Sequence, residues 1–494
     1  MPNTSNNTVT VKQYDDRVVV MSPPECVKDS LTIWEKTLDS RSKLELFATA
    51  EYKGGEVLVT YPGLAGHVCE ALCSHGMVPD LVDKRKACIA AGFPAPALDK
   101  MYGFRFSQEQ LLTEALAKDS SGLIGAPTRY GKTTLMINTL RAYPTLPAVV
   151  VAPGVDLVNQ LYDDLTGPRG LKGREVKKIT GKTRSKDPST TGVTVCTIDS
   201  LEYIDESLPR LVLADEPHAL VTDARIRHVN KFTKARRIGF GATLEGRFDN
   251  RDILIPGVFG PVLANKTYKE AVAEGAICQL NVIFLKVELT PRYFYSRNNA
   301  YDNALFLNAT MAKTVAGICR DVIPADMQTL VFIANKAQAE LYLDAMGEDA
   351  ALAMAMLFKN EKERVELVEQ VRRNGIKRCL CSNIFVQGVT FSDLMVLVNC
   401  NAGAKYTSTI QKPGRLAEIR PGKRCGVVID FMFTPPDDYE PCEDRGRTGD
   451  TWLMPYKDSM ARRKVYKKMG YGVYTVDTLA QMKDVFNTLT ATQQ

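Results

Sequence analysis

Short apolar runs separated by amphipathic segments recur along most of the chain. The apolar runs have the continuous hydrophobic character of strands buried on both faces. They occupy residues 148–152, 193–197, 211–214, 329–334, 378–382, 395–399 and 425–431. Segments with helical periodicity lie between them, for example 134–140 and 157–165. Alternating strands and helices predict an α/β fold with two doubly wound parallel sheets.

The order of these elements divides the chain into regions. Residues 1–98 contain strand-like runs and two helix-like runs, which predicts a small α+β domain. Two α/β domains are expected at 99–265 and 285–435, joined by a linker at 266–284. A basic extension with interleaved aromatic residues is expected at 436–494.

Composition adds weaker constraints. A chain of 494 residues has room for about three domains, and its 45% hydrophobic and 24% charged residues are ordinary for a globular protein. The net charge of +6 is compatible with a polyanionic partner. No apolar run is long enough to cross a bilayer, and Met1–Thr10 lacks an apolar signal core, so we expect a cytoplasmic protein without a membrane partner.

A phosphate-binding loop is predicted at Ala126–Thr133, which reads Ala-Pro-Thr-Arg-Tyr-Gly-Lys-Thr. Ala126 stands where such loops usually have their first glycine. The loop lies between a strand-like run and a helix-like run, where backbone N–H groups and a helix N-terminus suit a polyphosphate. Lys132 would reach the β- and γ-phosphates, and the Thr133 hydroxyl would ligate Mg²⁺.

Two adjacent carboxylates follow the buried run 211–214, at Asp215 and Glu216. Ligands of open α/β sheets bind at the carboxyl ends of the strands. Asp215 could hold Mg²⁺ through water there, and Glu216 could polarise an attacking water. The alternative is a solvated acidic turn, which the phosphate loop upstream makes the weaker interpretation.

Further segments follow in a recognisable order. They are Arg105–Gln108, Val151–Pro153 with Gln160, Cys196–Leu201, Gly241–Thr243, Leu330–Ala334, Ser382–Val389 and Gln411–Arg415. In this order, residues 99–435 resemble the two RecA-like domains of a superfamily 2 helicase. The resemblance implies ATP and Mg²⁺ as cofactors and a nucleic acid as partner.

The resemblance also assigns roles to individual residues. Catalysis would involve Lys132, Asp215, Glu216, Gln411, Arg415 and Arg420, with Thr133 and Asp215 on Mg²⁺. The nucleotide would contact Arg105, Gln108 (the adenine contact), Ala126, Pro127, Thr128, Gly131, Lys132, Thr133, Thr134 and Gly388. Nucleic-acid binding and coupling would involve Pro153, Gln160, Thr197, Ser200, Thr243, Asn335 and Ser382.

Two departures from the family pattern bear on activity. The last motif of the family has a second arginine where this chain has Glu418, so Arg420 would have to substitute or Arg415 would act alone. Such arginines contribute several orders of magnitude in rate, and slow turnover is therefore one expectation. The acidic segment continues Pro217-His218, and the Pro-Thr-x-x-Gln segment of one RNA-helicase group is missing, which favours DNA.

The first 98 residues resemble the N-terminal domain of UvsW-type branch-migration helicases of tailed phages. The resemblance rests on Tyr61–Leu64 and on the helix that ends at His75–Val78. It implies a monomeric DNA helicase, in the host cytosol if phage-encoded, that remodels forks and Holliday junctions beside replication or recombination proteins. The alternatives are a superfamily 2 RNA helicase and a helicase-fold scaffold with weakened catalysis.

Four segments allow both a functional and a structural interpretation. Basic residues at 172–186, the aromatic and cationic residues of 292–297, and the tail around Arg462–Lys468 could contact nucleic acid. The basic residues could equally lie on a solvated surface, and the aromatic residues could lie in the core. The cluster of His67, Cys69, Cys73 and His75 could bind zinc, but its spacing on one helix favours core cysteines.

Overall fold

The computed structural model divides into two compact units. The described residues are 7–36, 41–85, 93–181, 191–244, 251–290, 296–347, 350–353, 366–367, 369–371, 373, 375–382, 393–401, 403–420, 423, 425–437 and 451–491. The first unit comprises Met1–Pro127 and Gly131–Thr267. The second comprises Thr128–Tyr130 and Tyr268–Gln494.

The first unit begins with a five-stranded mixed sheet in the order β5-β6-β2-β1-β7. Its strands are β1 (Thr8–Gln13), β2 (Val18–Met21), β5 (Phe47–Tyr52), β6 (Gly55–Thr60) and β7 (Val78–Asp83). Only the β1–β7 pair is parallel. The hairpin β3 (Thr32–Lys36) and β4 (Arg41–Glu45) and the helices α1 (Glu25–Ser30) and α2 (Ala65–Ser74) complete this region, which is the mixed α and β structure expected.

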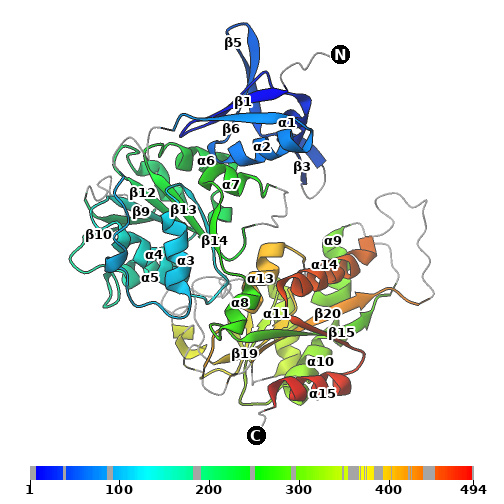
Figure 1. Cartoon of the computed structure of the whole chain (residues 1–494). Coiled ribbons are helices and arrows are strands. Elements are labelled where there is room, and N and C mark those ends of the chain that lie inside the picture. The colour runs from blue at the N-terminus through cyan, green and yellow to red at the C-terminus, as the bar shows by residue number, and fades with distance from the viewer. Residues whose placement is uncertain are drawn as a thin grey trace. The chain divides into compact units, whose positions relative to one another are not determined.

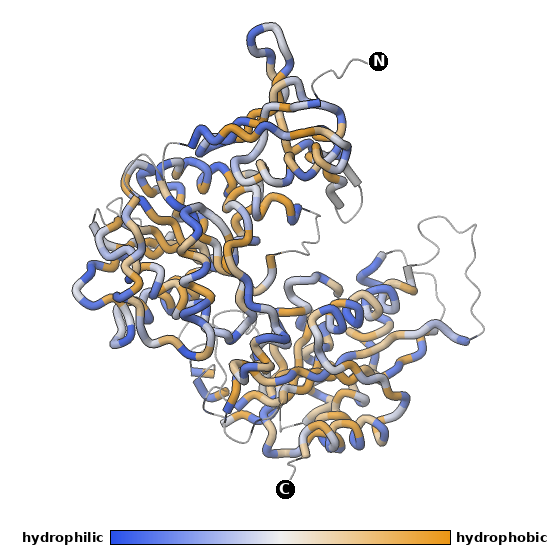
Figure 2. Tube along the Cα trace, viewed as in Figure 1, coloured by the Kyte–Doolittle hydropathy of each residue, from blue (hydrophilic) through white to orange (hydrophobic). Residues whose placement is uncertain are grey.

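The second sheet of this unit is wholly parallel, with the order β10-β11-β9-β12-β13-β8-β14. Its strands are β8 (Gly122–Gly125), β9 (Ala148–Ala152), β10 (Val176–Ile179), β11 (Val193–Thr197), β12 (Leu211–Asp215), β13 (Arg236–Gly241) and β14 (Val262–Asn265). Its helices are α3 (Gln108–Ala117), α4 (Lys132–Ala142), α5 (Val155–Thr166), α6 (Asp223–Asn230) and α7 (Leu254–Phe259). Strands β9 and β11 are fully buried, because helices cover both faces of such a sheet. Figure 1 shows the helices beside this sheet, and Figure 2 shows the hydropathy of the same residues.

The N-terminal region packs on α7 of the same unit through α2 and the 3-10 turn Pro62–Leu64, which follows β6. Leu64 and Val68 share one buried core with Leu254 and Phe259. The backbones approach so closely that a Cβ atom on Gly63 would lie 1.8 Å from the carbonyl oxygen of Pro256. Glycine is therefore required at position 63 by this contact.

The second unit contains another seven-stranded parallel sheet, in the order β17-β18-β16-β19-β20-β15-β21. Its strands are β15 (Gln279–Glu288), β16 (Gln328–Phe332), β17 (Ala350–Ala353), β18 (Arg378–Cys381), β19 (Leu394–Asn399), β20 (Cys425–Thr434) and β21 (Gly472–Val476). Its helices are α8 (Tyr268–Ala273), α9 (Arg297–Tyr301), α10 (Ala309–Gly317), α11 (Lys336–Met346), α13 (Tyr406–Gly414), α14 (Met454–Met469) and α15 (Leu479–Thr490). The predicted pair of parallel-sheet α/β domains is thereby confirmed.

Two segments differ from the expectation. The stretch 266–284, expected as a linker, contains α8 and the first half of β15, which lies inside the second sheet. The stretch expected as an extension supplies β21, which pairs with β15 over Asn281–Leu285 and Gly472–Val476. The elements α8, β15 and β21 therefore belong to the second unit.

A buried ion pair fixes helix α14 to this sheet. The Arg462 guanidinium donates two hydrogen bonds of 2.8 Å to Asp430, whose side chain is fully buried. Tyr466 also donates to Asp430, at 3.2 Å. Arg462, Tyr466 and Tyr471 are therefore core residues, and they are excluded as nucleic-acid contacts.

Candidate functional site: a phosphate loop and an acidic strand end

The predicted phosphate loop connects β8 to α4. The backbone N–H of Ala126 donates to the carbonyl of Gly241 at 3.0 Å, which ties the loop to the end of β13. Arg129 and Gly131 have φ values of 72° and 102°, so the chain turns through left-handed conformations before α4 begins at Lys132. The N-terminal N–H groups of α4 lack partners within the helix and suit an anion.

The acidic pair lies at the carboxyl end of β12, as expected. The Lys132 ammonium donates to Glu216 Oε1 at 2.5 Å, so residues 84 positions apart form one ion pair. His218 Nδ1 lies 3.4 Å from Glu216 Oε2. Glu216 has φ 53°, a strained conformation for this residue. The structure thus brings the predicted lysine and glutamate into contact, and it adds His218, which the sequence reading left without a role.

Asp215 has a carboxylate oxygen that is suited to a cation. Its Oδ1 is buried and has no hydrogen-bond partner among the described residues. Burial, together with the charge of Glu216, raises the pKa of Asp215 to about 6, while Lys132 acts in the opposite direction. A buried carboxylate without a partner is costly unless a ligand compensates it.

The residues present fit Mg²⁺ held with a nucleotide. Mg²⁺ is bound by one or two protein oxygens together with phosphates and water. Asp215 offers a carboxylate oxygen, and Thr133, in the first turn of α4, offers a hydroxyl. Within the described ranges, no cluster of three or more His, Cys, Asp or Glu side chains forms an all-protein metal site.

Thr243 follows the end of β13, the strand between β12 and β8. It is 4% exposed, and its hydroxyl is buried without a hydrogen-bond partner in the described part of the chain. A buried hydroxyl of this kind is a candidate for a hydrogen bond that forms in another state of the protein.

The predicted adenine-reading segment lies against the phosphate loop. Gln108 is 1% exposed, and its Oε1 accepts from the backbone N–H of Arg105 at 2.9 Å. A Cβ atom on Gly131 would lie 2.4 Å from Gln108 Nε2, so the amide packs directly on the loop. Phe106, which lies between Arg105 and Gln108 in the sequence, has φ 55° and is 53% exposed. It is a strained and exposed aromatic residue that the motif alone did not single out.

The predicted nucleic-acid residues lie in varied environments. Thr197 and Ser200 are buried, and their hydroxyl groups bond each other at 2.8 Å. Asn335 caps α11 by accepting from the N–H of Gln338. Pro153 and Ser382 are half-buried at strand ends, and Gln160 is exposed on α5.

The predicted second-domain residues lie on and after α13. Gln411 and Arg415 are half-buried, while Gly388 lies outside the described residues. Arg420 donates to Glu418 at 2.9 Å, so the candidate substitute arginine pairs with the glutamate that replaces the family's arginine. On the buried side of α13, burial lowers the pKa of Lys412 to about 8, with the charge of Arg462 acting in the same direction and that of Asp430 opposing it.

Several basic residues singled out by sequence are structural. The Arg174 guanidinium donates to the carbonyls of Leu140, Tyr143 and Leu146, and burial lowers its pKa to about 10. Arg297 pairs with Asp458. Residues 182–190 and 291–295 lie outside the described ranges. Arg174 and Arg297 are therefore excluded as contacts to a nucleic-acid backbone in this conformation.

The histidine and cysteine cluster is held by helix contacts. His67 Nε2 bonds the carbonyl of Ser30 at 3.0 Å, and His75 Nδ1 bonds that of Ala71 at 2.9 Å. Cys69 is half-buried and Cys73 is exposed. The expectation of core cysteines is therefore wrong for Cys73.

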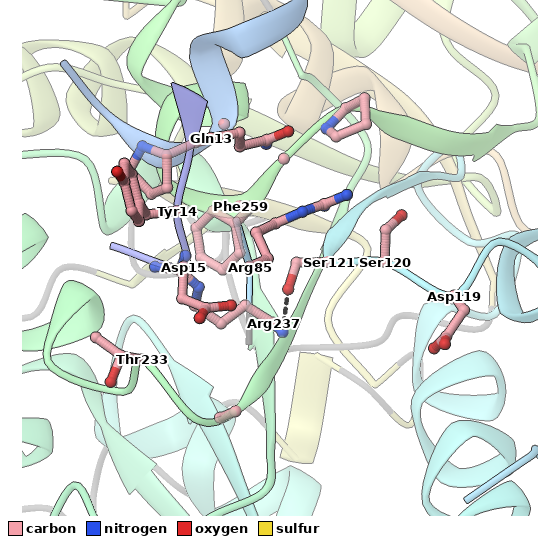
Figure 3. A pocket seen from close by; sticks show the side chains of 15 residues that line it. Gln13, Tyr14, Asp15, Arg85, Asp119, Ser120, Ser121, Thr233, Arg237 and Phe259 are labelled. Carbon is pink, nitrogen blue, oxygen red and sulfur yellow. Dashed lines mark hydrogen bonds between the residues drawn. The ribbon is translucent and has the colours of Figure 1, made fainter. Parts of the chain in front are cut away.

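A cavity of about 630 Å³, solvent at its mouth included, lies elsewhere in the first unit (Figure 3). It is lined by the β1–β2 turn, by Arg85 and by the amino ends of β8 and β13, where the Arg237 N–H donates to Ser121. Asp15 and Asp119 line it together with Arg85 and Arg237. Because both signs of charge are present, the cavity has no clear preference for an anion or a cation.

A match to a known protein family covers the phosphate loop and the acidic pair. Residues 101–246 match the family described as "Type III restriction enzyme, res subunit". No curated protein matches the chain in sequence. No helix of the described residues is long and apolar enough to span a membrane.

Solved structures share the fold at low identity. The fragment of a putative HsdR subunit of a type I restriction enzyme from Vibrio vulnificus is 15% identical, over 88% of this chain and 80% of that one, with a TM-score of 0.56. Dbp5 from S. cerevisiae, bound to RNA and ADP BeF3, is 16% identical over 80% and 100%, with a TM-score of 0.51. T4 UvsW is 15% identical over 95% and 99%, with a TM-score of 0.41.

The two parallel sheets, the order of the motifs and the family match define the class. The chain has the tandem RecA-like fold of a superfamily 2 helicase. The tandem RecA-like fold predicted from the sequence is thereby confirmed.

Proposed function

We propose that this protein is a nucleic-acid-stimulated ATPase that translocates on DNA and remodels branched DNA. The observation that carries the proposal is the contact of Lys132 with Glu216 beside the unpartnered oxygen of Asp215. A lysine for phosphates, a carboxylate for Mg²⁺ and a carboxylate for the attacking water are what phosphoryl transfer to water requires.

The residues of the first unit divide the chemistry among them. Lys132 and the N–H groups of the loop would hold the phosphates, and Thr133 with Asp215 would hold Mg²⁺, which neutralises charge on the β- and γ-oxygens when bound. Glu216 would orient and deprotonate water. Its strained backbone is consistent with a side chain held in place for a function.

Branched DNA is the proposed substrate because of the N-terminal sheet. That sheet is fixed to the first parallel sheet through Gly63 and α7, so a duplex bound there would be held next to the motor. RNA unwinding is the alternative within the same class, since motors of this fold contact mainly the sugar-phosphate backbone.

A binding scaffold with weak hydrolysis is the second candidate function. The Arg420–Glu418 ion pair favours the scaffold, because Arg420 is the candidate substitute for the second arginine of the family's last motif and here it is already paired with a carboxylate. Both side chains are partly exposed, so the pair is weak, and it could exchange for a phosphate.

The experiment is a steady-state ATPase assay on Glu216→Gln and Lys132→Ala, with and without forked DNA. We expect Lys132→Ala to lose hydrolysis because it loses a phosphate contact. Glu216→Gln should bind ATP and turn it over at least a hundredfold more slowly, because it lacks the base. Near wild-type turnover by Glu216→Gln would refute the assignment, and a wild-type protein without DNA-stimulated hydrolysis would favour the scaffold.

A further inference from the structure

The exposed side of α14 carries a row of lysines, which we call the α14 lysine row: Lys457, Lys464, Lys467 and Lys468. All four side chains are exposed. The spacings of seven and four residues from 457 to 464 to 468 place these positions on one side of a helix, with Lys467 beside them. Figure 1 shows α14 in the second unit, and Figure 2 shows the hydrophilic character of its residues.

The opposite side of α14 is held rigidly. Ser459, Arg462 and Tyr466 are buried there, and Arg462 is joined to Asp430 by two hydrogen bonds. The lysine row therefore stands on an element whose orientation is fixed by the core, as a binding surface requires.

No carboxylate of the helix balances the row. The one acidic residue of α14, Asp458, is 8% exposed and bonds Arg297 and the Tyr301 hydroxyl. No carboxylate in the described part of the chain forms an ion pair with Lys457, Lys464 or Lys467. Lys464 has Lys467 and Lys468 as its i+3 and i+4 neighbours, and such like-charge pairs destabilise a helix.

The helix dipole explains only part of the row. Lys467 and Lys468 lie in the last turn, where cations are favourable. Lys457 lies near the amino end, where a cation is unfavourable, and Lys464 lies between the two ends. Helix stability therefore does not account for Lys457 and Lys464.

We propose that the α14 lysine row binds the phosphodiester backbone of nucleic acid. From Lys457 to Lys468 the helix rises about 17 Å, the length of about five phosphates along one strand of a duplex. The proposal rests on the proposed function. It adds a nucleic-acid contact outside the superfamily motifs, on the helix that precedes β21, the edge strand of the second sheet.

The test measures how binding depends on salt. A variant with all four lysines changed to glutamine keeps helix propensity while removing four charges. A matched control changes Lys286, Lys313, Lys336 and Lys483, four exposed lysines of the same unit outside α14. Fluorescence anisotropy would follow labelled forked DNA, and single-stranded DNA and RNA of one sequence, from 50 to 300 mM KCl.

We expect the α14 variant to bind forked DNA at least tenfold more weakly at 100 mM KCl. Its slope of log K against log salt should fall by about three to four, because each neutralised phosphate contributes about 0.9. The control should keep the wild-type slope to within about one. Equal slopes for the two variants would overturn the proposal, as would a loss confined to DNA or to RNA, which would place the contact on the sugar.

Folding and the proposed function are checked separately. The thermal unfolding midpoint should match that of the control, and if the fourfold variant is unstable, Lys457→Gln with Lys464→Gln should lower the slope by about two. A wild-type protein that binds no nucleic acid would refute the proposed function. Tight wild-type binding that is indifferent to α14 would refute the lysine row alone.

Discussion

Individual residues in the predicted nucleotide motifs are held in energetically costly arrangements. Asp215 keeps a buried oxygen without a partner, and Glu216, Arg129 and Phe106 have positive φ values. The other positive-φ residues outside glycine in the described ranges are Ser22 and Lys53. Strain of this kind persists where the surrounding structure enforces it, and here it coincides with the nucleotide motifs.

Replacing Asp215 with asparagine should stabilise the protein while abolishing Mg²⁺-dependent hydrolysis. Its folded-state pKa of about 6 exceeds the usual 3.8, so its contribution to stability is complete below about pH 4 and is lost as the pH rises through about 6. At pH 8 the ionised carboxylate therefore costs about 3 kcal/mol, which Asp215→Asn removes.

Differential scanning fluorimetry of the nucleotide-free protein checks this prediction. The gain in unfolding temperature for Asp215→Asn should be largest near pH 8 and should shrink towards pH 5. Asp199→Asn, which removes an exposed ion pair with Arg225, should change stability by less than about 0.5 kcal/mol. A pH-independent effect of Asp215→Asn would contradict the stated origin.

Among the elements, α14 is one whose burial the sequence pattern did not predict. Its arginine and tyrosine residues indicated a surface helix, but Arg462 and Tyr466 point into the core. The reason is Asp430, 32 residues earlier on β20, which makes burial of an arginine tolerable. Pairing between distant residues leaves no local pattern, so the extension was read as separate from the second sheet.

Replacing Arg462 with methionine should lower the free energy of unfolding by about 3–5 kcal/mol, because Asp430 would remain buried without its main partner. Chemical denaturation of the full chain measures the effect. Lys464→Met, on the exposed side of the same helix, should cost less than about 0.5 kcal/mol. Comparable losses in the two variants would show that the helix, and not the ion pair, sets the cost.

At the scale of the whole molecule, the predicted fold class and the order of the strands along the chain hold. The buried strands β9, β11 and β12 were predicted to within a few residues, because they are continuously apolar. The buried strands β13 and β15 were not predicted, and part of β15 was assigned to a linker. The edge strand β21 was missed, because it is partly exposed and interrupted by polar residues. The phosphate loop and acidic pair were predictable from local sequence, whereas the His218 and Phe106 environments arise only from folding.

The docking of the N-terminal sheet within the first unit can be weakened by one methyl group. Gly63→Ala places a Cβ against Pro256 and should cost about 1–3 kcal/mol at this contact. We expect faster proteolysis of the N-terminal region, retained ATPase stimulation by single strands, and loss of fork and four-way-junction processing.

Gly66→Ala is the matched control, because its Cβ meets nothing within 4 Å on α2. It should behave as wild type in all three assays. Normal junction processing by Gly63→Ala, despite a loosened N-terminal sheet, would remove the support for branched DNA and leave a generic helicase.

The ion pair between Lys132 and Glu216 affects the proposed nucleotide site while it is empty. One ammonium group cannot fully neutralise both a carboxylate and an arriving triphosphate, so nucleotide entry and release of the glutamate become a single event. In the proposed ATPase, Glu216 would until then be occupied and Lys132 compensated, so the empty site would attract free phosphate only weakly. If the proposed hydrolysis takes place, the two side chains could rejoin when products leave, which would give each cycle a defined resting state and would oppose rebinding of the released products.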